Sequence, residues 1–150
     1  MEKILIWIAA AILVLLGAAL WLVCRRLFGM AILRDGNFTA DVAEDFKKQM
    51  DESRDLIERG RALYDSLPYE NLYLTSFDGL RLHARFYKNG DGKRVILLSH
   101  GFRSLGRGDF AAVFPLYYET LRCSLLVLDH RAHGESEGKY ITYGIHERFD

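Results

Sequence analysis

The chain has 150 residues, of which 50% are hydrophobic, with 20 acidic and 20 basic side chains. This length fits one domain with an appendage. The even charge balance gives no ground for binding to nucleic acid or to an anionic surface. The two cysteines, Cys24 and Cys123, lie far apart in sequence, so a disulfide framework like that of small secreted domains is not indicated.

The first apolar run extends from Ile4 to Val23 and contains no charged side chain. About 20 such residues cross a bilayer as a helix. Trp7 and Trp21 stand near the two ends, where tryptophan favours the membrane interface. We therefore expect residues 1–26 to form a transmembrane anchor. A cleaved signal peptide is the alternative, but the apolar residues continue past its candidate cleavage site at Gly17-Ala18-Ala19.

Basic residues flank this run unequally and predict its orientation. Lys3 precedes it, whereas Arg25, Arg26 and Arg34 follow it. Because positive loops stay on the cytoplasmic side, we expect a single-pass membrane protein whose soluble part is cytoplasmic.

Residues 27–68 are expected to form a connector and one amphipathic helix from Asp41 to Ser66. Asp41 with Glu44 resembles a capping box, and Pro68 marks the end of the helix. Apolar side chains recur at helical spacing at Val42, Phe46, Met50, Ile57 and Tyr64. We expect this stripe to pack on the domain rather than to bind a partner or a membrane.

A hairpin is predicted next, from two alternating runs, residues 71–76 and 80–87, around Asp78-Gly79. Alternation places Leu82 and Ala84 on an apolar face. It places His83 on the opposite, polar face, where we expect a solvated side chain or one at the rim of that face.

A short buried strand is predicted from Val95 to Leu98, and Ser99-His100-Gly101 with a glycine-rich loop follows it. A helix is expected from Phe110 to Leu121, with Pro115 near its start or at a kink. A second strand, from Ser124 to Leu128, ends on Asp129. Strand, helix and strand with short links predict a parallel crossover and an α/β fold, whose ligands bind at the carboxyl ends of the strands.

Three segments resemble, in order, the N-terminal part of an α/β-hydrolase. They are Asp78-Gly79-Leu80, Leu98-Ser99-His100-Gly101 and the ten residues from Asp129 to Gly138, within a likeness that covers about Leu72 to Asp150. In particular, the chain resembles membrane-anchored bacterial serine hydrolases of the serine-aminopeptidase and monoacylglycerol-lipase type. It departs from them at Ala132, where many relatives have glycine.

The resemblance implies a fold and a set of site residues. The fold is the N-terminal part of an α/β-hydrolase, a β-hairpin and then a parallel β-α-β unit, with residues 69–150 as a partial domain and a bacterial plasma membrane as its location. The backbone N–H of Phe102 is implied as an oxyanion-hole donor, a type of contact worth about 3 kcal/mol in acyl transfer. Structural loop roles are implied for His100, Gly101, Asp129, Arg131 and Gly134. No cofactor and no metal are expected.

The nucleophile of this family sits on a G-x-S-x-G elbow between a strand and a helix. Gly134-Glu135-Ser136-Glu137-Gly138 matches the string, but the preceding strand ends at Asp129, and His146 and Asp150 follow too closely to act as base and acid. We therefore expect no catalytic residue here and place the nucleophile, acid and base beyond residue 150. The chain is predicted to be an inactive fragment of a membrane-anchored serine hydrolase that cleaves a small ester or amide through an acyl-enzyme.

Three alternatives remain open. The chain could be a short non-catalytic membrane protein that acts as an interaction module through its charged helix. Gly101, Gly106 and Gly108, followed by Asp129, leave nucleotide binding open, although they do not form a dinucleotide fingerprint. His130 and His133 could begin a zinc site but lack a third ligand. The partners that we expect are a membrane, through Ile4 to Val23, and a small ester or amide substrate, without nucleic acid.

Overall fold

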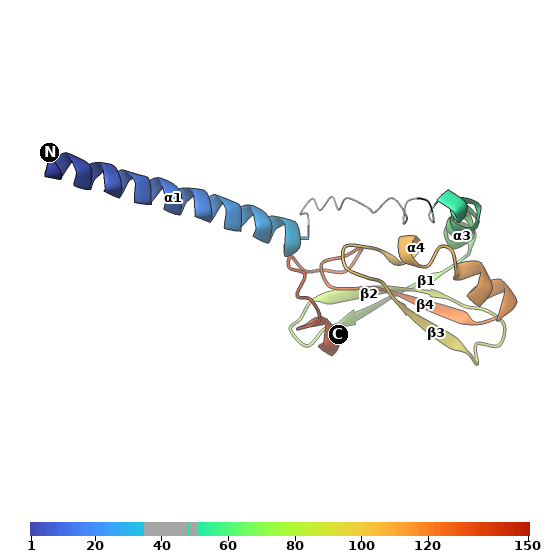
Figure 1. The fold of residues 1–150 in the computed structure, drawn as a ribbon. Helices are drawn as coiled ribbons and strands as arrows, with labels where there is room; N and C mark the ends of the chain where they lie inside the picture. Colours follow the sequence, from blue (N-terminus) through green and yellow to red (C-terminus); the bar gives the residue numbers. More distant parts are fainter. Residues whose placement is uncertain (35–47, 49–50) are drawn as a thin grey trace. The chain divides into compact units, whose positions relative to one another are not determined.

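The computed structural model describes residues 1–34, 48 and 51–150, and the chain divides into two units, Met1–Thr39 and Ala40–Asp150. The first unit contains helix α1 (Glu2–Ala31). The second contains a four-stranded sheet with short helices (Figure 1).

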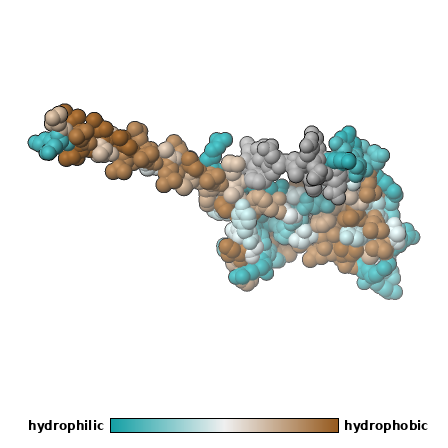
Figure 2. Space-filling model, in the orientation of Figure 1, coloured by the Kyte–Doolittle hydropathy of each residue, from teal (hydrophilic) through white to brown (hydrophobic). Residues whose placement is uncertain are grey.

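Helix α1 has 30 residues and a length of about 45 Å at 1.5 Å per residue. Figure 2 shows an almost continuous hydrophobic surface along it. Its length and composition are sufficient to cross a membrane, and a signal sequence near the N-terminus would have the same properties. The helix continues beyond the predicted apolar run, through Arg25 and Arg26.

The sheet contains four strands in the order β1-β2-β4-β3. Strand β1 pairs antiparallel with β2, β2 pairs antiparallel with β4, and β3 pairs parallel with β4. The predicted hairpin, parallel β-α-β unit and α/β fold class are thus confirmed. The strands are β1 (Glu70–Thr75), β2 (Arg81–Tyr87), β3 (Val95–Ser99) and β4 (Ser124–Asp129).

The helical segment between β3 and β4 differs from the expected continuous helix from Phe110 to Leu121. It begins earlier, with helix α4 (Gly106–Asp109), and after a turn continues as the π-helix η1 (Leu116–Thr120). Pro115 precedes η1 and has no backbone N–H for an ordinary helical hydrogen bond. Within this turn the Leu121 N–H donates to the Leu116 carbonyl, five residues earlier, at 2.9 Å, which is the π-helical pattern.

Helix α3 (Arg54–Ser66) ends before Pro68, as predicted. Most of the first half of the predicted helix, with its capping box, lies outside the described residues. The described part of the apolar stripe, Ile57 and Tyr64, packs on the domain. Tyr64 is buried, and a Cβ atom at Gly60 would lie 1.6 Å from the Ala111 carbonyl oxygen, so α3 approaches this backbone more closely than any side chain would allow.

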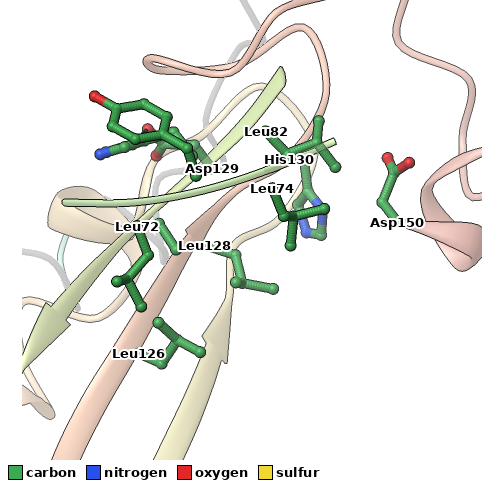
Figure 3. Close-up of a pocket in the computed structure, with 11 residues that line it drawn as sticks. Leu72, Leu74, Leu82, Leu126, Leu128, Asp129, His130 and Asp150 are labelled. Atoms are coloured by element: carbon green, nitrogen blue, oxygen red, sulfur yellow. Dashed lines mark hydrogen bonds and ion pairs between the residues drawn. The ribbon is translucent and has the colours of Figure 1, made fainter. Parts of the chain in front are cut away.

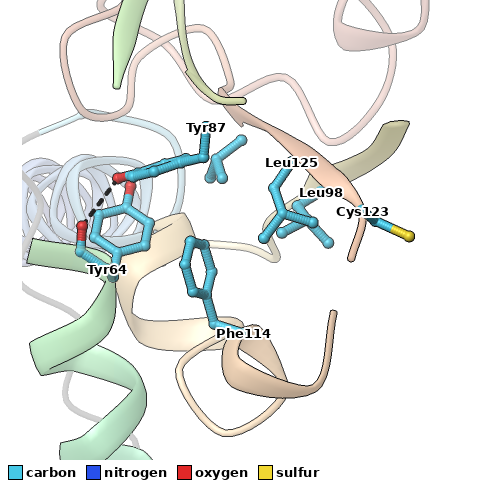
Figure 4. Packing of buried hydrophobic residues seen from close by; sticks show 7 residues of the cluster. Tyr64, Tyr87, Leu98, Phe114, Cys123 and Leu125 are labelled. Atoms are coloured by element: carbon cyan, nitrogen blue, oxygen red, sulfur yellow. Dashed lines mark hydrogen bonds between the residues drawn. The ribbon is translucent and has the colours of Figure 1, made fainter. Parts of the chain in front are cut away.

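The hydrophobic core lies between these helices and one face of the sheet (Figure 4). Tyr64, Tyr87 and Phe114 form a triangle of aromatic rings with centroids 5.2 Å apart. The Tyr87 hydroxyl donates to the Tyr64 carbonyl at 3.3 Å. The other buried members are Leu98, Cys123, Leu125 and Val127.

The opposite face of the sheet carries a second set of apolar side chains. Leu74 is 52% exposed and Leu97 is 58% exposed. Leucines from three strands line a groove of about 360 Å³, with His130 and Asp150 toward one end (Figure 3). The sheet therefore presents one packed face and one partly open apolar face.

The C-terminal segment ends in a single 3-10 turn, η2 (Glu147–Phe149).

Candidate functional site

The loops that follow β3 and β4 meet at one edge of the sheet, because the carboxyl ends of parallel neighbours lie side by side. They enclose a cavity of about 290 Å³ together with the segment before η2. Its lining consists of His100, Gly101, Phe102, His130, His133, Ile141, Tyr143, Gly144 and Glu147. This is the position that the sequence predicted for a site.

His100 is buried and fastens the two loops together. Its Nε2 atom accepts a hydrogen bond from the His130 backbone N–H at 3.1 Å, so the proton lies on Nδ1, which donates to the Gly101 carbonyl at 2.9 Å. Burial lowers the pKa of His100. The Nε2 atom already accepts the hydrogen bond from His130 and is not available as a general base. The structural role that the resemblance implies for His100 stays a prediction.

The loop after His100 is fixed by Asp109. This carboxylate accepts hydrogen bonds from the Gly101 N–H, at 2.7 Å, and from the Ser104 hydroxyl. The Phe102 ring stacks on Tyr143, with ring centroids 5.0 Å apart and an interplanar angle of 24°. The role of the Phe102 backbone N–H as an oxyanion donor stays a prediction.

The partly buried Asp129 and the buried His83 form a polar pair. The Asp129 carboxylate lies 2.8 Å from His83 Nδ1 and accepts from the Glu135 N–H at 2.9 Å. His83 Nε2 lies 2.9 Å from the Asn71 side-chain oxygen. The expectation of a solvated His83 was therefore wrong, since that side chain is only 2% exposed. Strand β2 has neighbours on both sides, and the loop that follows β4 returns over this face.

Ser136, the serine of the G-x-S-x-G string, is 1% exposed, and its hydroxyl group both donates and accepts a hydrogen bond. Its Oγ donates to the Asp129 carbonyl at 2.5 Å and accepts from the His83 N–H at 2.8 Å. The string therefore ties a loop to two strands, and its serine is not presented to a substrate.

Arg131 is buried and connects three distant segments. Its guanidinium donates two hydrogen bonds to the Asp150 carboxylate, at 2.6 and 2.7 Å, and two to Asp78, at 2.8 and 3.2 Å. It also lies over the Phe77 ring, 5.3 Å from the centroid. Hydrogen bonds from Arg131, with a further one from Ser76, lower the pKa of Asp78 to about 2.

Glu147 organises the segment beneath the cavity. Its carboxylate accepts from the Thr142 N–H at 2.8 Å, the Thr142 hydroxyl at 2.6 Å and the Gly144 N–H at 2.8 Å. Burial raises the pKa of Glu147, but these hydrogen bonds outweigh it and bring the pKa to about 2.

The rings of His130 and His133 both contact the His100 ring edge to face, with centroids 4.6 and 4.8 Å from it. His133 Nδ1 donates to the Arg131 carbonyl at 2.9 Å, and burial lowers the pKa of this side chain. Among the described residues, no group of three or more histidine, cysteine, aspartate or glutamate side chains is placed to hold a metal ion.

His130 makes a contact that the sequence did not predict. Its Nε2 atom lies 2.8 Å from the Ser99 hydroxyl oxygen. The two residues are 31 positions apart, and only the parallel pairing of β3 with β4 brings them together. Each residue lies directly at or after the end of a predicted strand. That location was the feature of the sequence from which their contact could have been predicted.

No family model matches the chain, and no curated protein matches it. Two crystal forms of the esterase Pf2001 of Pyrococcus furiosus are similar to it. One shows 31% identity over 65% of this chain and 34% of that chain, with a TM-score of 0.47. The other shows 28% identity over 77% and 37%, with a TM-score of 0.48.

The alpha/beta hydrolase GrgF from Penicillium sp. sh18 is also similar, with 22% identity over 48% of this chain and 25% of that chain and a TM-score of 0.40. The chain spans about a third of the length of the Pf2001 structures. All three TM-scores are below 0.5.

Proposed function

We infer that this chain is the N-terminal part of an α/β-hydrolase. The observation that carries the inference is that the three family-like segments, which are separated by up to about fifty residues, bind one another directly. Asp78, from the first segment, accepts hydrogen bonds from Arg131, in the third. His100, from the second, accepts the His130 N–H. Motifs that matched the family by chance would not be expected to contact one another at the carboxyl ends of parallel strands.

The proposed reaction is hydrolysis of a small ester or amide through an acyl-enzyme. In the complete protein, a serine outside these 150 residues attacks the substrate carbonyl, and an acid and a histidine outside them complete the triad. The described residues would supply the loop around Phe102, whose backbone N–H donates to the oxyanion. Asp109 and His100 would hold this loop in place before substrate binds, which is the condition for such donors to be effective.

We propose in addition that α1 anchors this hydrolase as a single transmembrane helix in a bacterial plasma membrane, with the sheet on the cytoplasmic side. The apolar length of α1 supports the anchor. The arginines at positions 25, 26 and 34 support the orientation. Protease protection in sealed membrane vesicles of known orientation tests the orientation directly.

The experiment that tests the proposed function uses the native gene product, extracted from membranes of its source cell. We expect an intact mass of roughly twice 17.2 kDa, that of an anchor with a complete domain. We also expect a fluorophosphonate adduct on a serine in a peptide beyond residue 150. A mass near 17.2 kDa without such an adduct would overturn the proposal and favour the interaction-module alternative.

A pair of variants of that product tests the oxyanion role. Phe102→Pro removes the backbone N–H, whereas Phe102→Ala removes the ring and keeps the N–H. We expect the proline variant to lower kcat by about 10²–10³-fold. The alanine variant should change kcat far less. Equal losses in both variants would show that the ring is what matters and that the N–H is not a donor.

A further inference from the structure

Ser99 and His130 form a hydrogen-bonded pair outside the roles already assigned. Ser99 is the last residue of β3 and is an exposed residue. His130 directly follows β4, and its Nε2 atom lies 2.8 Å from the Ser99 oxygen. A serine hydroxyl and an imidazole nitrogen at 2.6–3.2 Å have the geometry of a nucleophile with its general base.

The position of His130 is fixed by its neighbours. Its backbone N–H is bound by His100, and the two imidazole rings meet edge to face, with centroids 4.6 Å apart and an interplanar angle of 67°. His130, the base of the pair, is thus held in place directly after β4, an inner strand of the sheet. Ser136 lacks these features, because it is buried and its hydroxyl donates to a carbonyl oxygen.

We propose that Ser99 and His130 constitute a second nucleophile–base pair, which transfers acyl groups from activated esters to Ser99. The Ser99 oxygen forms a bond to the ester carbonyl carbon while its proton passes to His130 Nε2. The bond to the leaving oxygen then breaks, and that oxygen takes the proton from His130. Water hydrolyses the resulting acyl-serine by the reverse proton path. This activity goes beyond the proposed function, in which catalysis belongs to a serine outside the chain.

The adjoining groove indicates the class of ester. Ser99 aligns with Leu128 in the parallel register, and both Leu128 and His130 line the apolar groove of about 360 Å³ (Figure 3). An uncharged, apolar acyl chain would lie along the leucines with its carbonyl carbon near Ser99. The carboxylates of Asp129 and Asp150 also line the groove and would disfavour an anionic acyl group.

The test uses the 150-residue chain in detergent micelles, treated with an alkyl fluorophosphonate and mapped by peptide mass spectrometry. Ser66 is the internal reference, since it is exposed but its hydroxyl donates to the Leu63 carbonyl instead of an imidazole. We expect the adduct on Ser99 to form at least tenfold faster than any adduct on Ser66. Equal rates at the two serines, or no adduct on Ser99, would overturn the proposal without bearing on a serine beyond residue 150.

Two variants test whether fast labelling of Ser99 depends on His130 as a base or only on the solvent exposure of Ser99. His130→Gln keeps a side chain that can hydrogen-bond Ser99 but cannot take a proton at neutral pH, and we expect it to slow Ser99 labelling at least tenfold. Ser66→Ala should leave Ser99 labelling unchanged. Undiminished labelling in a folded His130→Gln chain contradicts the proposal, and circular dichroism establishes folding. If that variant does not fold, the ratio of Ser99 to Ser66 labelling in the unaltered chain decides the question.

Discussion

Gly134 occupies a position where the backbone and its surroundings both select against a side chain. Its φ angle is +48°, in the left-handed region that glycine adopts most readily. A Cβ atom there would lie 2.2 Å from Asp129 Oδ2, the oxygen that binds His83 and the Glu135 N–H. The glycine thus allows the loop to close around the partly buried Asp129 carboxylate.

We therefore expect Gly134→Ala to destabilise the domain by about 2 kcal/mol or more, through the combined cost of left-handed backbone and displacement of Asp129. Chemical unfolding of the chain in detergent, followed by circular dichroism, measures this change.

Ala132 provides a matched control in the same loop. Its φ angle is +59°, so glycine would relieve the backbone while losing one buried methyl group. These effects oppose each other, and Ala132→Gly should alter stability by less than about 1 kcal/mol. If both variants lost the same stability, the loop would be sensitive to any change and the Asp129 contact would not be the cause.

At the scale of elements, two hydrogen-bonded carboxylates stabilise the segment after β4: Asp78 joins it to the hairpin through Arg131, and Glu147 binds Thr142 and Gly144 within it. The pKa values of Asp78 and Glu147 are each about 2, below the value of about 4 of an unfolded chain. Their stabilisation is therefore complete above about pH 5 and is lost as the pH falls toward 2. Burial lowers the pKa of His100 and His133, so both are held neutral in the folded chain. Stability is therefore also lost as the pH falls below the pKa of an unfolded histidine, at milder acidity than for the carboxylates.

The Glu147→Gln variant isolates one part of this acid response. It removes the negative charge that binds Thr142 and Gly144, and we expect it to lower the free energy of unfolding by about 1 kcal/mol at pH 7. The difference from the unaltered chain should shrink between pH 5 and pH 2, where Glu147 itself becomes protonated. Urea unfolding at several pH values measures it. A difference independent of pH would mean that the loss comes from packing and not from the charge.

The elements themselves could be predicted from local patterns, and their contacts could not. Alternation around Asp78-Gly79 defined the hairpin, and apolar runs ending on Ser99 and Asp129 defined the parallel strands, because these signals reside in neighbouring residues. The burial of His83 depends on a loop that begins more than forty residues later. The π-helix after Pro115 likewise depends on hydrogen bonds that periodicity does not encode.

On the scale of the whole molecule, the sheet is stabilised unequally on its two faces. Tyr64, Phe114 and the other core side chains cover one face. On the other, Leu74 and Leu97 are more than half exposed. Within the described residues, β3 forms backbone pairs with β4 alone, so one of its edges is open. An apolar face beside an open strand edge is a surface that favours association between chains.

We therefore expect the 150-residue chain to self-associate in detergent micelles beyond what α1 alone causes. Leu97→Lys places a charge on the exposed face of the edge strand and should shift the chain toward monomer at least severalfold, as measured by sedimentation velocity. Leu56→Lys, at an exposed leucine of α3, is the matched control and should leave the distribution unchanged. A monomeric chain with one sharp, cooperative melting transition would show instead that the open face is tolerated, and that the four strands with their helices form a self-sufficient domain.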